Sequence, residues 1–175
     1  GTVSAIIENK IVKIENCHFK SGKDFLQLSG EYDGNGNYDI SRIQLAHNDN
    51  YLINANPINF SYKDSILNVR PFEFHINDGV MEGVITSANS NEGRFKMSNF
   101  DADIITQIFS DDRLRFSGLI FGEIWIGYEN NDFNMDADIS LKKATYMNEK
   151  FDEMTLSCLY KSGILSIDDI SMARK

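Results

Sequence analysis

Apolar and polar residues alternate along most of the chain, most clearly in Ile58–Tyr62, Leu67–Arg70, Phe72–Ile76 and Phe133–Leu141. Because successive side chains of a strand point to opposite faces, this pattern predicts half-buried strands with one apolar face. Segments rich in Gly and Asn separate the runs, as expected for tight turns between antiparallel neighbours. These segments are Asp33–Asn37, Asn77–Gly79, Asn91–Gly93, Glu129–Asp132 and Lys161–Gly163. The predicted fold is all-β and mostly antiparallel.

One segment departs from this alternation, from Asp101 to Phe109. Ile104 and Ile108 lie one helical turn apart, and Asn99 or Asp101 could cap the first turn. The spacing predicts one short amphipathic helix.

A loose internal repeat divides the chain into approximate units 11–110 and 111–175. Leu28-Ser29-Gly30, Met81-Glu82-Gly83 and Phe121-Gly122 each end an apolar stretch with Gly, before a polar turn and another alternating strand. Such repeats suggest a sheet that extends by adding units, although ordinary hairpin patterning explains them as well. The chain begins at Gly1 without Met. We therefore expect residues 1–175 to be a single segment of a longer chain.

The apolar face is bulky and must be buried against something: itself by curling, a second sheet, or an apolar ligand. One interpretation is a closed barrel or sandwich filled by side chains. The other is a curled, incompletely closed sheet whose groove holds acyl chains. Composition does not separate the two. The residues expected to line such a groove are Leu26, Leu28, Ile53, Ile58, Phe60, Tyr62, Leu67, Val69, Phe72, Phe74, Ile76, Phe95, Met97, Phe116, Ile124, Ile126, Phe133, Met135, Ile139, Leu141, Leu156, Leu165 and Ile167.

Composition narrows the function. The chain has 175 residues, the size of about one domain. Its formal net charge of −9, from 17 Lys and Arg against 26 Asp and Glu, argues against nucleic acid as a partner. No apolar run approaches the ~20 residues of a membrane-spanning helix. Cys17 and Cys158 follow no metal or redox spacing; they could pair in an exported protein, or remain two separate cysteines on strands.

Motifs for catalysis are missing from the sequence. His18, His47 and His75 are isolated, and no His or Cys pair has the spacing of a zinc site. There is no nucleophile elbow, phosphate loop or dinucleotide fingerprint. We therefore expect a protein that is not an enzyme, with no metal and no cofactor.

The stretch from Leu114 to Ser171 resembles the C-terminal half of the TamB family, within the AsmA-like superfamily of bacterial envelope proteins. The resemblance rests on a Gly-rich strand, an alternating strand and a final pair of strands, and Leu26 to Ile105 is similar to the preceding unit. The matching residues are Leu114, Phe116, Gly118, Ile120, Gly122, Ile124, Ile126 and Gly127, then Phe133 to Leu141, then Phe151, Asp152, Met154, Leu156, Tyr160, Gly163, Leu165 and Ile167.

The resemblance implies a curled β-taco, or open barrel, with an apolar interior. It also implies a periplasmic part of a protein anchored in the inner membrane, which pairs with an Omp85-type outer-membrane barrel through the parent chain. The expected function is a non-catalytic segment of a conduit for phospholipid acyl chains between the two membranes, linked to outer-membrane protein assembly. Two alternatives remain: a periplasmic scaffold or chaperone with exposed sheet edges, and a closed, lipocalin-like binder of an apolar ligand.

Overall fold

The computed structural model of the chain describes residues 1–47, 50–64, 66–86, 91–102, 116–129, 132–146 and 149–174. These residues form thirteen β-strands. The strands are β1 (Thr2–Glu8), β2 (Ile11–Ser21), β3 (Asp24–Tyr32), β4 (Asn37–His47), β5 (Asn50–Asn54), β6 (Ile58–Lys63), β7 (Ile66–Ile76), β8 (Gly79–Thr86), β9 (Asn91–Asp101), β10 (Phe116–Glu129), β11 (Asp132–Tyr146), β12 (Glu149–Lys161) and β13 (Ile164–Ala173).

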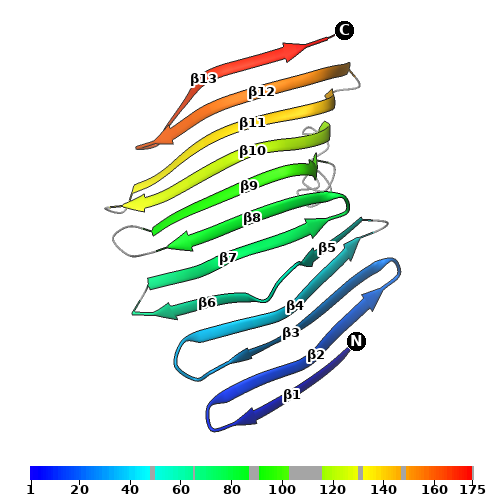
Figure 1. The fold of residues 1–175 in the computed structure, drawn as a ribbon, viewed down its shortest axis with the longest axis vertical. Coiled ribbons are helices and arrows are strands. Elements are labelled where there is room, and N and C mark those ends of the chain that lie inside the picture. Colours follow the sequence, from blue (N-terminus) through cyan, green and yellow to red (C-terminus); the bar gives the residue numbers. More distant parts are fainter. Residues whose placement is uncertain are drawn as a thin grey trace. The chain divides into compact units, whose positions relative to one another are not determined.

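All thirteen strands belong to one antiparallel sheet, in the order β1-β2-β3-β4-β5-β7-β8-β9-β10-β11-β12-β13 (Figure 1). Strand β6 lies off this path and pairs with both β4 and β7. The predicted all-β, antiparallel fold class is therefore confirmed. In the strand order of the described sheet, β1 and β13 are the first and last strands.

The predicted helix lies mostly outside the described residues. Asp101 ends strand β9, Ala102 follows it in helical conformation, and the structure does not describe residues 103–115. In the part of the chain that is described, no helix is long and apolar enough to cross a membrane.

The chain divides into two compact units, which are treated separately below. Unit 1 comprises residues 1–77 and 82–91, and unit 2 comprises residues 78–81 and 92–175. This division falls upstream of the predicted repeat boundary between residues 110 and 111.

Tight turns with left-handed backbone connect several of the hairpins. Asn9 and Lys10 have φ values of 50° and 70°, and Ser162 and Gly163 have values of 51° and 76°. Positive φ at two successive residues is typical of the two-residue turns that match the twist of a hairpin. The predicted turn at Asn91–Gly93 is wrong, since these residues belong to β9.

The longer turn between β3 and β4 is held together by Asp33. Its carboxylate accepts hydrogen bonds from the backbone N–H groups of Asn35 (2.7 Å) and Asn37 (3.1 Å), and from Asn37 Nδ2 (2.6 Å). The side-chain bond from Asn37 is the main cause that lowers the pKa of Asp33 below its ordinary value of 3.8.

Candidate functional site

The clearest candidate site is one face of the sheet in unit 2. Directly opposed residues of an antiparallel pair share a face. The pairing of β10 with β11, of β11 with β12 and of β12 with β13 therefore builds four successive rows across the four strands. In strand order, the rows are Ile126-Met135-Tyr160-Leu165, Ile124-Ala137-Cys158-Ile167, Gly122-Ile139-Leu156-Ile170 and Ile120-Leu141-Met154-Met172. We call these rows the apolar face of unit 2; the Tyr160 hydroxyl is their only polar side-chain group apart from the Cys158 thiol.

Strand β9 extends this face. A side chain at Gly93 would run into Ile126, which places Gly93 on the apolar face. Phe95 and Met97 share its side by alternation. Met97 is buried and Phe95 is half-buried.

Gly122 is needed for the close approach of β10 and β11. Its φ of +144° lies in the region that favours glycine, and a Cβ there would collide with the carbonyl oxygen of Asp138. The absence of a side chain at Gly122 therefore lets β10 approach β11 closely enough to pair in register at the third row.

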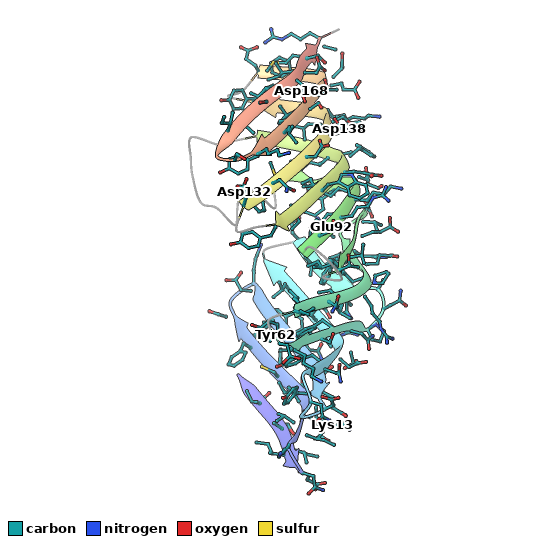
Figure 2. All side chains as sticks on the ribbon, turned by 90° about the vertical axis from the view of Figure 1, so that its left-hand side faces the viewer. Lys13, Tyr62, Glu92, Asp132, Asp138 and Asp168 are labelled. Atoms are coloured by element: carbon teal, nitrogen blue, oxygen red, sulfur yellow. The ribbon has the colours of Figure 1, made fainter. Side chains whose placement is uncertain are left out.

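The opposite face of unit 2, which we call the acidic face, carries charged side chains together with the apolar Trp125, Leu159 and Phe121. One row across it reads Glu123-Asp138-Ser157-Asp169, and Asp136 lies opposite Trp125 in the next row. Figure 2 shows the side chains of this region as sticks, with Asp138 labelled. The same four strands thus carry a charged face and an uncharged face.

Arg94 offsets part of this negative charge. Its guanidinium lies 2.6 Å from Glu123 Oε2, and its Cζ lies 4.4 Å from the centre of the Trp125 ring. A cation between a carboxylate and an aromatic face lowers the repulsion between the opposed carboxylates Glu123 and Asp138.

The apolar face of unit 2 is only partly buried. Its central positions are covered, with Ile120, Ala137 and Cys158 at most 6% exposed. Toward β13 and the strand ends the exposed fractions rise, to 59% for Ile170 and 42% for Phe133. Within the described residues, every strand belongs to the same sheet.

Unit 1 has a corresponding apolar face. One row runs through six strands, as Ile7-Val12-Tyr32-Tyr38-Phe60-Val69. Two more rows are Val3-Cys17-Leu28-Ile43 and Phe19-Leu26-Leu45-Leu52-Ile76. The rings of Tyr32, Tyr38 and Phe60 stack with centroids 4.7 Å and 4.5 Å apart.

Most of the predicted lining residues fall on these two faces. Strand register and alternation place the following predicted residues of unit 1 on its apolar face: Leu26, Leu28, Ile58, Phe60, Tyr62, Leu67, Val69, Phe72, Phe74 and Ile76. Those of unit 2 on its apolar face are Phe95, Met97, Ile124, Ile126, Phe133, Met135, Ile139, Leu141, Leu156, Leu165 and Ile167. Phe116 begins β10, but its side chain is outside the described part.

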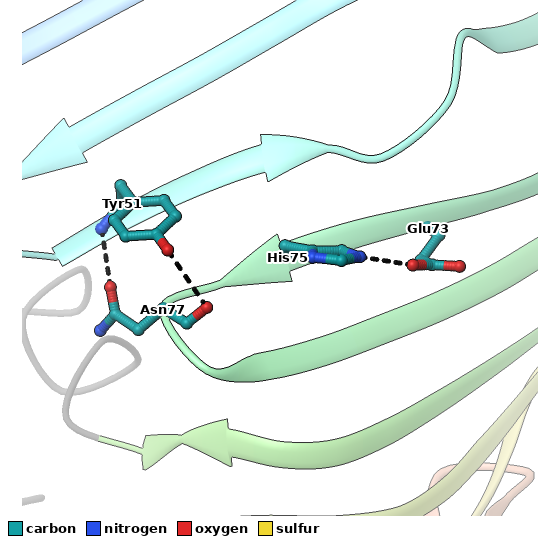
Figure 3. Close-up of polar contacts among 4 residues, drawn as sticks. All are labelled: Tyr51, Glu73, His75 and Asn77. Carbon is teal, nitrogen blue, oxygen red and sulfur yellow. Dashed lines mark hydrogen bonds and ion pairs between the residues drawn. The ribbon is translucent and has the colours of Figure 1, made fainter.

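Ile53 lies on the face opposite to the other predicted lining residues of unit 1. It is opposed to Gln44 and His75, whereas its neighbour Leu52 is opposed to Leu45 and Ile76. His75 Nε2 contacts the Glu73 carboxylate on this polar side, as Figure 3 shows. The alternation in Tyr51–Ala55 is equally compatible with either face, and pairing with β4 and β7 decides between them.

Sequence reasoning missed several residues of the apolar faces. Most of them lie in short or interrupted alternating runs, where no clear parity signal exists, whereas Ala137 lies within the clear run Phe133–Leu141. They include Val3, Ile7, Val12, Cys17, Phe19, Tyr32, Tyr38, Ile43, Leu45 and Leu52 in unit 1, and Ile120, Tyr128, Ala137, Met154, Cys158, Tyr160, Ile170 and Met172 in unit 2.

Asn54 is a buried polar side chain within the apolar face of unit 1. It is 8% exposed and lies opposite Phe74. Its Oδ1 accepts the Ile43 N–H at 2.7 Å, and its Nδ2 donates to the carbonyls of Asn56 (2.8 Å) and Ser41 (3.2 Å). The amide thereby replaces ladder hydrogen bonds where β4 changes partner from β5 to β6.

We also considered a polar hollow, metal-ligating side chains and the two cysteines as candidate sites. A hollow of about 460 Å³ lies among polar residues of unit 1, including Lys13, Glu31 and Asp39. In the described ranges, no group of three His, Cys, Asp or Glu side chains is placed to hold a metal ion. Cys17 and Cys158 are both free thiols.

Comparison with known proteins adds no relative: no protein-family model, no curated protein and no solved structure matches the chain.

Proposed function

We propose that the chain binds the acyl chains of phospholipids along its apolar faces and forms a non-catalytic segment of a lipid conduit. The observation that carries this proposal is the contrast between the two faces of unit 2. Four rows without a charged side chain lie on one side, and the Glu123-Asp138-Ser157-Asp169 row lies on the other. A sheet with water on both faces would carry polar side chains on both of them, so an uncharged face indicates that something apolar covers it.

The partial exposure of the apolar face supports a ligand over a filled core. Side chains such as Ile167 and Met172 are 56% and 50% exposed. Large exposed apolar patches mark binding surfaces in soluble proteins. Burying this surface under an acyl chain would contribute roughly 25 cal/mol for each Å² removed from water.

The chemistry of the lining suits sliding rather than fixed binding. The rows of unit 2 consist of Ile, Leu, Met, Ala, Gly, Cys and one Tyr. Such side chains offer dispersion contacts but few directional bonds, so one acyl position costs nearly the same free energy as the next. In this proposal no residue performs a chemical step.

The cellular setting of the proposal comes from the resemblance to the TamB family. On that basis the segment lies in the periplasm, as part of a protein anchored in the inner membrane. The rest of the parent chain would reach an Omp85-type barrel, and phospholipid would move between the two membranes in support of outer-membrane protein assembly.

The direct test is photocrosslinking at two adjacent positions of β11. Met135 lies on the apolar face and Asp136 on the acidic one. A photoreactive residue is placed at each position, and the purified chain is incubated with vesicles of phosphatidylethanolamine and phosphatidylglycerol. We expect lipid adducts at position 135 and none at 136. Equal labelling at both positions, or none at 135, would contradict the proposal.

A second candidate is a scaffold that adds a client strand at β13. All ten residues of β13 are exposed, and the strand contains neither Pro nor Lys, two residues that block edges. It carries Asp168 and Asp169 and a register irregularity against β12, which disfavour the addition of a strand. A photoreactive residue at Ser166, offered an unfolded outer-membrane barrel polypeptide, tests this role. Client adducts at 166 without lipid adducts at 135 would favour the scaffold.

A further inference from the structure

Strand β1 has one strand neighbour in the described sheet. It pairs with β2 from Thr2 to Glu8 and is the first strand in the sheet order (Figure 1). All seven of its residues are exposed, with Val3 at 62% and Ile7 at 73%. In an antiparallel ladder, alternate residues direct their backbone N–H and C=O groups away from the neighbouring strand. In β1 these groups have no partner among the described strands, so they are available to a further strand.

The side chains of β1 also favour a further strand. The strand contains neither Pro nor Lys, and its one charged residue, Glu8, lies at its end. Val3, Ala5 and Ile7 lie on the apolar face of unit 1, since all three are opposed to Ile, Val or Cys of β2. A strand that pairs with β1 and continues this face therefore needs apolar side chains at alternate positions.

Strand β1 itself meets this requirement, because its sequence is complementary to its own reverse. Antiparallel pairing of β1 with β1 of a second copy, centred on Ala5, opposes Val3 of each copy to Ile7 of the other. Pairs of β-branched side chains directly opposite each other stabilise a sheet. All three apolar-face positions of the strand thus find an apolar partner.

The other face of the same pairing brings no two charges together. Thr2 of each copy is opposed to Glu8 of the other, so the hydroxyl can donate a hydrogen bond to the carboxylate. Ser4 is opposed to Ile6, and both are uncharged. A two-fold axis through the centre of the pairing repeats every contact, as in other interfaces between identical chains.

Strand β13, the last strand in the sheet order, fails the same comparison. Pairing all ten of its residues with their own reverse opposes Asp168 to Asp169 at the centre. Like charges directly opposite each other destabilise a sheet. Self-complementarity is therefore a property of β1 and is not shared by the other strand whose residues are all exposed.

We propose that β1 pairs antiparallel with β1 of a second copy of this chain and forms a two-fold symmetric dimer. The two-fold axis is perpendicular to the paired strands and to the sheet, so the apolar faces of both copies of unit 1 lie on the same side. The row that ends at Ile7 then continues into Val3 of the other copy. Seven-residue strands make less contact than a standard interface of ~1,600 Å², so we expect a weak dimer that dissociates on dilution.

The test measures the molar mass of the whole 175-residue chain by sedimentation equilibrium, without lipid. An ionic strength of about 0.15 M is used, because each copy carries a net charge of −9 and salt screens such charges beyond ~8 Å. We expect the mass to rise from that of a monomer toward that of a dimer between about 5 and about 500 µM, the range of a weak interface.

Two double variants of β1 test the register. Val3→Lys with Ile7→Lys opposes ammonium to ammonium at two places across the axis, whereas Val3→Lys with Ile7→Glu opposes ammonium to carboxylate there. Both variants remove the same two exposed apolar side chains. We expect the first variant to dimerise about tenfold more weakly than the second, which corresponds to ~1.4 kcal/mol over the two opposed pairs. Parallel pairing would bring like charges together in both variants and would give no such difference.

The matched control places the same charges on β13. Ile167→Lys with Ile170→Lys changes two residues that are 56% and 59% exposed, and this variant should dimerise as the wild type does. Circular dichroism on every variant confirms that the β-sheet is retained.

Three results would overturn the pairing of β1 with itself. They are a wild type that stays monomeric over the whole range, equal dimerisation of the two β1 variants, and a loss of dimer in the β13 control. The lipid adducts expected at position 135 do not depend on this pairing, so either proposal can fail while the other stands.

Discussion

The two units build the same kind of apolar face in different ways. In unit 2, strands of 13 to 15 residues from β10 to β12 keep one register along their four central rows. The register shifts at Ser117/Leu119 in β10, near the end of the strand, and at Ser157/Cys158 in the pairing of β12 with β13, between the second and third rows. In unit 1, the register shifts between neighbouring strands at Ser4/Ala5, Ile14/Cys17 and Ser29/Glu31. There β4 also changes partner, from β5 to β6.

Unit 1 keeps one face apolar even though the register between its neighbouring strands shifts. A one-residue slip would send every later side chain of a strand to the other face. Strand β2 contains an extra residue against both of its neighbours, after which Cys17 and Phe19 return to the side of Val12 and Ile14. A bulge in the strand matches a break in its sequence alternation, so the face remains apolar.

The largest loss of stability is expected from a charged substitution at the most buried position of the four rows in unit 2. Ala137 is 3% exposed at the centre of a row. We expect Ala137→Asp to lower the free energy of unfolding by ~3 kcal/mol or more, because a carboxylate there is buried without a partner. Urea unfolding measures this change. Ala173→Asp, at an exposed position of β13, is the control and should change stability by ~1 kcal/mol at most.

The irregular face of unit 1 should be most sensitive at Asn54. Asn54→Leu would leave the Ile43 N–H and the carbonyls of Ser41 and Asn56 without their partner. Unsatisfied buried groups cost ~1–3 kcal/mol, and we expect a loss of ~2 kcal/mol in unfolding free energy. Asn59→Leu, which removes only an exposed bond to Pro57, should cost ~0.5 kcal/mol. Equal losses in the two variants would show that the Asn54 amide does not hold the β5–β6 transition.

Substitutions at half-exposed positions should change lipid binding without a large change in the free energy of unfolding. Phe133 is 42% exposed on the apolar face, and Leu159 is 39% exposed on the acidic face. We expect Phe133→Lys and Leu159→Lys each to cost ~1 kcal/mol or less, since both ammonium groups reach water. Only Phe133→Lys should reduce lipid retention, by roughly tenfold, because a buried Phe contact is worth ~1.5–3 kcal/mol. Mass spectrometry of copurified lipid with thermal melting gives both values; similar lipid loss in the two variants would contradict the assignment of faces.

The smallest expected effect is a pH dependence of the stability of the β3–β4 turn in unit 1. Hydrogen bonds from Asn37 and Asn35 lower the pKa of Asp33, so the folded state favours the ionised carboxylate. This stabilisation is complete above the ordinary value of 3.8 and is lost as pH falls through the lower pKa of the folded state. Hydrogen exchange of the hairpin should therefore lose protection below about pH 4, and Asp33→Asn should abolish this dependence. Asn37→Ala should raise the pKa of Asp33 toward its ordinary value, and an unchanged titration would exclude Asn37 as the cause.

Alternation along the chain by itself determined the class of fold and the membership of most of the apolar face. Phe133 to Leu141 and Phe72 to Ile76 show one apolar residue in every two, and extended backbone places those residues on one side wherever the strand lies. The information is local, because the period of a strand does not depend on its partners.

Tertiary structure decided the register and the exceptions. Ile53 and Leu52 are both apolar and adjacent, and only pairing with β4 and β7 assigns Leu52 to the apolar face. Likewise Asn54 is a polar residue of the alternating run Tyr51–Ala55, and it lies buried because β4 changes partner beside it. Hydrogen bonds between strands far apart in sequence fix these choices, and no local pattern contains that information.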